Sequence, residues 1–377
     1  MIYLSRVTLG KNNSKNESNI NRPVKLSIMT KRSNPEELAV VADKRPRTEY
    51  ETSARAVGKE LSIKTKRHFM KGPIMLLTGH DGEILTSKFH PSGTAIASAG
   101  ADRSIYLWAT RGDCENYAIL KAAHSNTIIE LQYSRDGERL FSCSADKTVT
   151  VWDSTTGCRL KKLRGHTSFV NSISTGPSDK NVIASVSDDC HINIWDLRTK
   201  KAAHTFKDSY PLTAVAFNKQ TDQVLVGGIE NTINIWDLKK AAVHYKLTGH
   251  MDTITGLSVS PDGRHVLSNS MDNTLKCWNI QPFVQNNRLE KTFLGHQHNF
   301  EKNLLRCSWS PNGNMVAAGS SDRNVYIWSF NSCDILYKLP GHRGSVNEVA
   351  FSPKEPVVMS CSSDKQIYLG EINYDLI

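Results

Sequence analysis

Serine, histidine and aspartate side chains recur together along the chain in sets that could support nucleophilic catalysis. Ser98, His80 and Asp102 are the three residue types of a hydrolase triad, in which His activates a Ser hydroxyl and Asp orients the His. Four further sets follow: Ser142, His124 and Asp146; Ser185, His166 and Asp189; Ser268, His250 and Asp272; Ser360, His342 and Asp364. An active site needs one nucleophile in one cleft, whereas a structural network can recur in every repeat. The recurrence therefore predicts a structural network, and we expect no catalytic residue and no enzyme.

Six tryptophans close the repeating units that carry these sets. They are spaced by 44, 43, 41, 42 and 50 residues, and each ends a strand-like run such as SIYLW or TVTVW. An acidic residue stands six positions before each Trp, and a Gly-His or its remnant stands about 28 positions before most of them. A seventh unit has Gly370 where Trp is expected. The six tryptophans are Trp108, Trp152, Trp195, Trp236, Trp278 and Trp328.

This period and its G-H and W-D signatures resemble the WD-repeat (WD40) family. The resemblance implies an all-β, seven-bladed propeller in which His, Ser, Asp and Trp are hydrogen-bonded inside each blade. Two units depart from the pattern. The fourth has Asp208, Val226 and Glu230 at the His, Ser and Asp positions, and is expected to rely on apolar packing. The sixth keeps His296, Asp322 and Trp328 in the predicted network but has Ala318 in place of Ser.

Ring closure is predicted from the two ends of the repeat region. The last unit ends after its third strand, while an unassigned strand, Ile74 to Leu77, precedes the first Gly-His. An open array of blades would leave apolar end faces exposed to water, so closure is favoured. We therefore expect Ile74 to Leu77 to pair beside Ile367 to Leu369 and complete the seventh blade.

Charge divides the chain into two predicted parts. Residues 1–71 are basic and lack hydrophobic periodicity, so they are expected to be a disordered tail, whereas residues 72–377 form a nearly neutral propeller. Two basic clusters in the tail resemble a bipartite nuclear-import signal, which predicts a nuclear protein. These clusters are Lys31 and Arg32, then Lys44, Arg45 and Arg47. No segment approaches the roughly 20 apolar residues of a membrane span.

Cofactor and metal sites are not indicated by the motifs of the chain. The eight cysteines form no C-x-x-C pair, and neither a P-loop nor a GxGxxG sequence is found. We therefore expect no cofactor and no metal.

The sixth unit is longer than the others and predicts a partner-binding loop. His296 and Trp328 are 32 residues apart instead of the usual 28, with an insertion from Gln297 to Asn303. Insertions in propellers map to loops and often to the binding face. The candidate partner-binding residues are Phe300, Glu301, Lys302, Asn303 and Arg306.

A more specific resemblance covers residues 72–377. The runs HNFEKNLLRCSWSP (298–311), GPIMLLTGH (72–80), LRGHTSFVNS (163–172) and LYKLPGH (336–342) resemble the WD-repeat proteins of the U5 small nuclear ribonucleoprotein. The resemblance implies a non-catalytic spliceosomal scaffold for pre-mRNA splicing. It implies docking on the large central U5 splicing factor and other spliceosomal proteins, indirect association with U5 RNA, and a propeller that is monomeric within a larger complex.

Two other readings compete with the scaffold. Trp195-Asp196-Leu197-Arg198 resembles the W-D-x-R signature of substrate receptors of cullin-type ubiquitin ligases, although W-D followed by a basic turn is ordinary repeat sequence. A heterotrimeric G-protein β subunit would need an N-terminal coiled coil, and residues 1–72 contain no heptads. The ligase receptor therefore stands as the alternative function.

Overall fold

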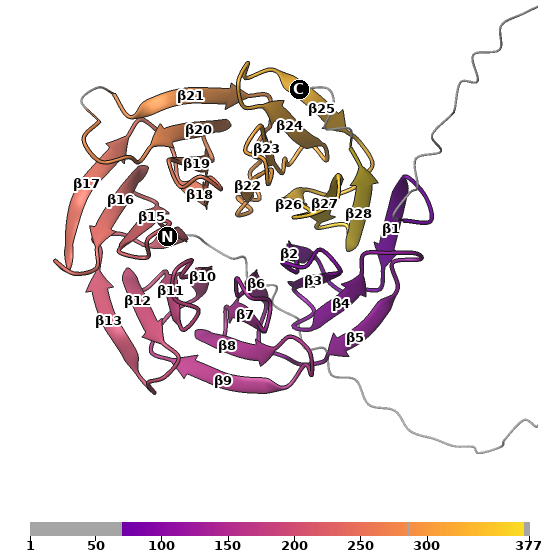
Figure 1. Cartoon of the computed structure of the whole chain (residues 1–377), viewed down its shortest axis with the longest axis horizontal. Helices are drawn as coiled ribbons and strands as arrows, with labels where there is room; N and C mark the ends of the chain where they lie inside the picture. The colour runs from indigo at the N-terminus through magenta and orange to yellow at the C-terminus, as the bar shows by residue number, and fades with distance from the viewer. Residues whose placement is uncertain (1–69, 285–286, 373–377) are drawn as a thin grey trace, which may run out of the picture. The chain divides into compact units, whose positions relative to one another are not determined.

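The computed structural model describes residues 70–284 and 287–372 as seven four-stranded antiparallel sheets arranged as the blades of a ring (Figure 1). The predicted seven-bladed propeller is thus confirmed. No helix occurs among these described residues, and so none there is long and apolar enough to cross a membrane. Residues 1–69 of the predicted tail, which include its two basic clusters, lie outside the described residues.

The blades follow one another in chain order. Blade one contains β2 (Ile84–Phe89), β3 (Ala95–Gly100), β4 (Ile105–Ala109) and β5 (Asn116–Leu120). Blade two contains β6 (Ile128–Tyr133), β7 (Arg139–Ser144), β8 (Thr148–Asp153) and β9 (Arg159–Arg164). Blade three contains β10 (Val170–Thr175), β11 (Val182–Ser187), β12 (His191–Asp196) and β13 (Ala202–Lys207). Blade four contains β14 (Leu212–Phe217), β15 (Gln223–Gly228), β16 (Thr232–Asp237) and β17 (Ala242–Thr248).

The remaining blades complete the ring. Blade five contains β18 (Ile254–Val259), β19 (His265–Ser270), β20 (Thr274–Asn279) and β21 (Leu289–Leu294). Blade six contains β22 (Cys307–Trp309), β23 (Met315–Ala318), β24 (Val325–Ser329) and β25 (Ile335–Leu339). Blade seven contains β26 (Val346–Phe351), β27 (Val357–Ser362), β28 (Gln366–Glu371) and β1 (Ile74–Thr78).

The closing strand lies where the sequence predicts it. β1 is the outermost strand of blade seven and pairs antiparallel with β28, with Met75 opposite Leu369 and Leu77 opposite Ile367. Contacts begin slightly before the predicted boundary at residue 72, because Met70 is buried and forms a β-bridge with Gly112. The chain therefore closes its own ring through backbone hydrogen bonds between the two ends of the described region.

Burial explains the different character of the strands in a blade. The third strands, such as β8 and β16, are buried almost throughout because they lie between neighbouring blades. β-branched residues suit such strands, since they pack well on a pleated surface. The outermost strands alternate more, as in β5 and β17, because one of their faces is in contact with solvent.

A β-bulge accompanies each tryptophan of the repeat. In blades one to six the register between the third and fourth strands shifts at the Trp, as between Leu107 and Trp108. Blade seven has Gly370 at this position, and the pairing of β28 with β1 is regular. Bulges re-aim side chains, and the indole ring lies in the apolar cluster shared with the preceding blade, as Trp152 does with Ile105 and Leu107 of blade one.

Candidate functional site

The predicted hydrogen-bonded sets are brought together inside five blades. In blade one, His80 Nδ1 is 2.6 Å from Asp102 Oδ2 and His80 Nε2 is 2.7 Å from Ser98 Oγ. Trp108 Nε1 donates to the same Ser98 Oγ at 2.8 Å. The same three contacts occur in blade two (His124, Asp146, Ser142, Trp152), blade three (His166, Asp189, Ser185, Trp195) and blade five (His250, Asp272, Ser268, Trp278).

Blade seven forms the network without a tryptophan. His342 Nδ1 is 3.0 Å from Asp364, and its Nε2 is 2.9 Å from Ser360 Oγ. Tyr368 packs edge-on against the imidazole, with ring centroids 4.7 Å apart. The ring of Tyr368 thus contacts the imidazole of His342, as the Trp indole contacts the imidazole in other blades.

The Asp of each set also holds the tight turn between the second and third strands. Asp146 accepts from the backbone N–H of Thr148 at 3.1 Å, as an Asx turn requires. Burial alone would raise the pKa of Asp146, but hydrogen bonds from His124 and Thr148 outweigh burial and lower this pKa. The carboxylate therefore stays ionised and orients the imidazole.

These serines are poorly placed for catalysis. Ser98, Ser142, Ser185 and Ser268 are completely buried, and the oxygen of each already accepts the indole N–H. A nucleophilic hydroxyl must instead reach a substrate carbonyl. The geometry gives a Trp–Ser–His–Asp chain of hydrogen bonds that joins the strands of a blade.

Replacing Ser268 by Ala is expected to destabilise the propeller by about 1–3 kcal/mol, because the buried Trp278 N–H and His250 Nε2 both lose their partner. Ser258→Ala is the matched control on the neighbouring strand β18, because the Ser258 hydroxyl has no hydrogen bond to the part of the chain that the structure describes, and it should change stability by less than about 0.5 kcal/mol. Urea unfolding of both variants measures the difference. Equal midpoints for the two variants would argue against the network.

Blade four replaces the network with a different set of contacts. Asp208 accepts from Asn234 Nδ2 at 2.9 Å, and Glu230 pairs with Lys246 at 2.9 Å. Val226 stands at the Ser position, so the buried Trp236 Nε1 has no hydrogen-bond partner among the described residues. Trp236 instead stacks on Phe206, with centroids 5.5 Å apart. Val215, Phe217, Ile233 and Ile235 are all buried in the adjoining apolar clusters.

In blade six the structure does not join the three residues that were predicted to share a network. His296 Nε2 donates to Asn269 of blade five at 2.8 Å, and Trp328 donates to the carbonyl of Leu294. Asp322 accepts from the Tyr326 hydroxyl at 2.7 Å. The physical reason is Ala318: without a serine hydroxyl between them, His296 and Trp328 turn to separate partners.

His296 makes stability sensitive to mild acid. The imidazole is 1 % exposed, and burial together with repulsion from His298 lowers its pKa from 6.5 to about 3, although Asp272 and Asp322 oppose the shift. The folded state therefore binds fewer protons than the unfolded chain. This contribution to stability is complete above pH 6.5 and is lost as the pH falls towards 3.

When the pH is lowered from 7.5 to 5.5, His296 is expected to lower the free energy of unfolding by about 1.4 kcal/mol. This is the value of one pH unit below the pKa of the imidazole in the unfolded chain. His296→Gln keeps a donor for Asn269 but does not titrate. The stability of this variant should therefore fall by about this amount less than the stability of the unchanged protein. Chemical unfolding of both proteins at the two pH values measures the difference. Parallel losses would contradict a buried, neutral His296.

The inserted loop of blade six is fixed at both of its ends. The His298 N–H donates to Asn273 in blade five at 2.6 Å, while Glu301 accepts from the Ser345 hydroxyl in blade seven at 3.1 Å. Phe300 lies between these anchors and is 91 % exposed. The loop therefore presents its aromatic ring to solvent on a backbone that is held in place.

The other predicted partner-binding residues divide into two groups. Glu301, Lys302 and Asn303 lie on the same loop as Phe300, and Lys302 has a left-handed backbone (φ 54°). Arg306 does not lie at this surface. It is 5 % exposed and donates to the carbonyls of Asn171, Thr213 and Thr255, in three other blades. The prediction that Arg306 takes part in a surface interface was therefore wrong, because the chain turns inward at Leu305 to begin β22.

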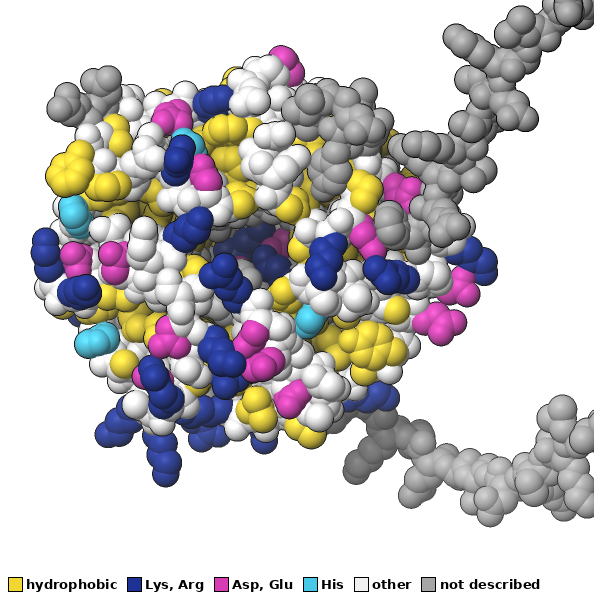
Figure 2. Space-filling model, in the orientation of Figure 1, with side chains coloured by type: hydrophobic (Ala, Val, Ile, Leu, Met, Phe, Trp, Pro, Cys, Tyr) yellow, Lys and Arg dark blue, Asp and Glu magenta, His cyan; other side chains and the backbone are white. Residues whose placement is uncertain are grey.

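Arg306 belongs to a cluster of buried charges that the sequence analysis missed. It lies 3.5 Å from Glu130 of blade two, and Lys88 of blade one pairs with Glu348 of the adjacent blade seven. Figure 2 shows basic and acidic side chains inside the hollow at the middle of the ring. Burial opposes the charge on Lys88, but Glu348 and Glu130 outweigh burial and raise its pKa. Single charges within otherwise buried innermost strands are the signal that could have revealed this central cluster.

A second exposed apolar side chain lies beside the inserted loop. Met251, in the loop before β18, is 87 % exposed. Its N–H donates to Asp272 at 3.0 Å, and the adjacent Asn273 accepts from His298 at the start of the inserted loop. Both loops therefore contact the same β19–β20 turn and lie on one face of the propeller.

The W-D-x-R segment and the cysteines have local explanations. Arg198 is 64 % exposed and pairs with Asp196 at 2.9 Å and Asp179 at 3.2 Å.

All eight cysteines are free thiols, and burial raises the pKa of Cys307 and Cys361 to about 12. Within the described ranges, no group of three or more His, Cys, Asp or Glu side chains is placed to hold a metal ion.

The sequence of the chain is similar to a known family and to individual known proteins. The family model described as "WD domain, G-beta repeat" matches residues 71–109, 116–153, 157–196, 200–237, 242–279, 287–329 and 333–369. The chain is 54 % identical over 303 residues to the human U5 small nuclear ribonucleoprotein 40 kDa protein, covering 80 % of this chain and 85 % of the relative.

More distant relatives carry related names. The Dictyostelium discoideum U5 small nuclear ribonucleoprotein 40 kDa protein is 45 % identical over 332 residues, covering 88 % of this chain and 93 % of the relative. The pre-mRNA-splicing factor cwf17 of Schizosaccharomyces pombe is 41 % identical over 314 residues, covering 83 % and 92 %. The similarity therefore extends over most of each protein.

Proposed function

The chain belongs to the WD-repeat family and, within it, to the family of U5 small nuclear ribonucleoprotein 40 kDa proteins, and from this membership we propose a non-catalytic scaffold of the U5 particle that acts in pre-mRNA splicing. The similarity over most of each relative carries the assignment to splicing. The buried serines and the rigid ring support action by binding. A ring of seven blades holds its surface loops at fixed relative positions, so several partners can be arranged around it.

The partner that we propose is the large central splicing factor of the U5 particle, bound through the face that bears Phe300 and Met251. Two large apolar side chains on adjacent loops, each almost fully exposed, are of the kind that anchors protein interfaces. Both loops are tied to the β19–β20 turn, so little conformational entropy is lost when a partner covers them. U5 RNA is then associated indirectly, through the protein partners.

Capture from nuclear extract tests this face. Tagged full-length chain should recover the large U5 factor, identified by mass spectrometry, and Phe300→Ser should reduce its recovery about tenfold or more, as loss of a buried aromatic anchor does. Phe283→Ser is the matched control, because Phe283 is 96 % exposed but lies in the β20–β21 connection, at the other end of β20. Equal recovery by both variants would exclude the Phe300 face, and recovery of cullin adaptors without U5 proteins would favour the ligase alternative.

We propose a nuclear location, in keeping with the names of the splicing relatives. The two basic clusters of the tail, Lys31–Arg32 and Lys44 to Arg47, supply a sequence that an import receptor could bind. Cell fractionation followed by detection of the tagged full-length chain tests the location. A chain confined to the cytoplasm would contradict it.

A further inference from the structure

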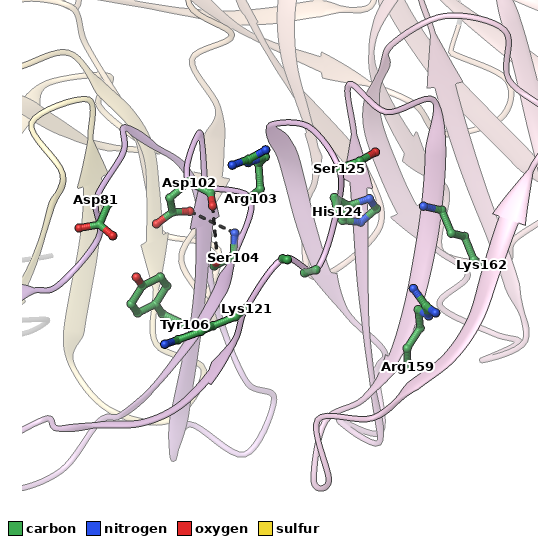
Figure 3. A pocket seen from close by; sticks show the side chains of 12 residues that line it. Asp81, Asp102, Arg103, Ser104, Tyr106, Lys121, His124, Ser125, Arg159 and Lys162 are labelled. Carbon is green, nitrogen blue, oxygen red and sulfur yellow. Dashed lines mark hydrogen bonds between the residues drawn. The ribbon is translucent and has the colours of Figure 1, made fainter. Parts of the chain in front are cut away.

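A basic hollow lies between blades one and two, whereas Met251 precedes blade five and Phe300 precedes blade six. Its volume is about 680 Å³, and four cationic side chains line it. Arg103 lies in the β3–β4 turn, Lys121 follows β5, and Arg159 and Lys162 lie on β9. Figure 3 shows Arg103 on the blade-one side and Arg159 and Lys162 on the blade-two side.

The cations of this hollow are incompletely neutralised. Arg103, Lys121 and Arg159 form no ion pair within the described part of the chain, while Lys162 lies 3.3 Å from Asp146. Two acidic residues line the hollow, Asp81 and Asp102. The carboxylate of Asp102 already accepts from His80 and from the N–H of Ser104. Three cations without ion pairs therefore line a space that an anion could enter, Arg103 and Lys121 from blade one and Arg159 from blade two (Figure 3).

The repeat is altered at this hollow by a longer connection between blades one and two. Trp108 and His124 are separated by 16 residues, whereas 14 separate Trp152 from His166 and Trp236 from His250. The longer connection replaces the usual Gly before His with Lys121-Ala122-Ala123. Arg103 occupies the left-handed turn position (φ 63°) that the other blades fill with Lys, Cys, Asn or Arg, so no particular side chain is needed there. Neither Lys121 nor Arg103 is thus required by the fold of the blade.

The shape and lining of the hollow favour a single phosphate group over a nucleic-acid strand. Proteins that bind single-stranded RNA offer exposed aromatic rings on which bases stack. Tyr106, which lines the hollow, is 7 % exposed and packs against His80 (3.9 Å between centroids) and Trp108 (5.9 Å), and the imidazole of His124 is 3 % exposed. Both rings are covered, so the hollow provides charge without a stacking platform.

We propose that this hollow binds the phosphate group of a phosphorylated serine or threonine in a partner protein. Such a group carries a charge of about −1.5 to −2 and three strong acceptor oxygens, which suit Arg103 and Arg159 as forked donors and Lys121 as a point charge. The site is independent of the U5 assignment and of the Phe300 face. It would make binding of one partner segment dependent on phosphorylation.

Fluorescence anisotropy with the full-length chain tests the site. The probe is a labelled Gly-Gly-phosphoserine-Gly-Gly peptide, compared with its unphosphorylated form and with a labelled pentauridylate RNA. The phosphopeptide should bind saturably, and the unphosphorylated peptide should not. The triple variant Arg103→Gln, Lys121→Gln, Arg159→Gln should weaken phosphopeptide binding about tenfold or more, since charge-assisted bonds to phosphate are lost.

A matched triple variant distinguishes a site from general attraction. Lys200→Gln, Lys201→Gln and Lys239→Gln remove the same charge from exposed positions on other blades, and should leave phosphopeptide binding unchanged. Thermal unfolding of each variant checks that the ring is intact. Equal weakening by both triple variants, absence of saturable phosphopeptide binding, or binding of pentauridylate with the same dependence on Arg103, Lys121 and Arg159 would each overturn the phosphopeptide site.

Discussion

Removal of strand β1 is expected to prevent the propeller from folding as a stable ring. A chain beginning at Met70 keeps β1, whereas a chain beginning at Gly79 loses its five residue pairs with β28. Ile367 and Leu369, which are completely buried, would then lie on an uncovered edge strand. The loss is on the order of 5 kcal/mol or more, which is comparable to the whole stability of many domains. Thermal unfolding followed by circular dichroism compares the two chains.

A point substitution tests closure without truncation. Leu77→Ala should cost about 2–5 kcal/mol, because Leu77 is 4 % exposed and packs in the cluster shared by blades seven and one. Ile74→Ala, on the same strand, should cost little, since Ile74 points outward and is 68 % exposed. The same melting temperature for the chains beginning at Met70 and Gly79, or for these two variants, would show that β1 does not hold the ring closed.

Arg306→Met is expected to destabilise the ring by about 3–5 kcal/mol. The guanidinium donates to carbonyls of blades three, four and five, and its removal leaves Glu130 buried beside Lys88 without its second cation. Adding Glu130→Gln removes the uncompensated charge, so the double variant should recover part of the loss. Denaturant unfolding of the four proteins in a double-mutant cycle measures the coupling.

A surface arginine provides the comparison for Arg306. Arg198→Met breaks the exposed pair with Asp196 and should cost less than about 1 kcal/mol. Similar losses for Arg198→Met and Arg306→Met, or strictly additive effects of Arg306→Met and Glu130→Gln, would contradict a central charge cluster that joins the blades.

The repeat made the ring predictable from the sequence. The spacing of the tryptophans gives the number of blades, and the strand before the first Gly-His gives the closing partner of β28. Both follow from local pattern, because each unit has the same strand order and the same need to bury its faces. The contacts of His80, Ser98, Asp102 and Trp108 are local to one blade in the same way.

What could not be predicted depends on contacts between blades. Arg306 is next to an inserted loop in the sequence, yet its side chain contacts three other blades, and its farthest partner, Asn171, is 135 residues away. His296 finds Asn269 in the preceding blade because its own blade lacks the serine. The basic hollow combines β9 of blade two with the β3–β4 turn of blade one, and no periodicity within a unit indicates that meeting.

Sequencing of the RNA that co-purifies with the tagged full-length chain from a nuclear fraction tests the scaffold assignment most directly. A U5 scaffold should enrich U5 small nuclear RNA over the small nuclear RNAs of other particles. Phe300→Ser should reduce that enrichment and Phe283→Ser should not, because the RNA is reached through the protein partner. A chain that is recovered intact from the nuclear fraction without enrichment of U5 RNA would contradict the account.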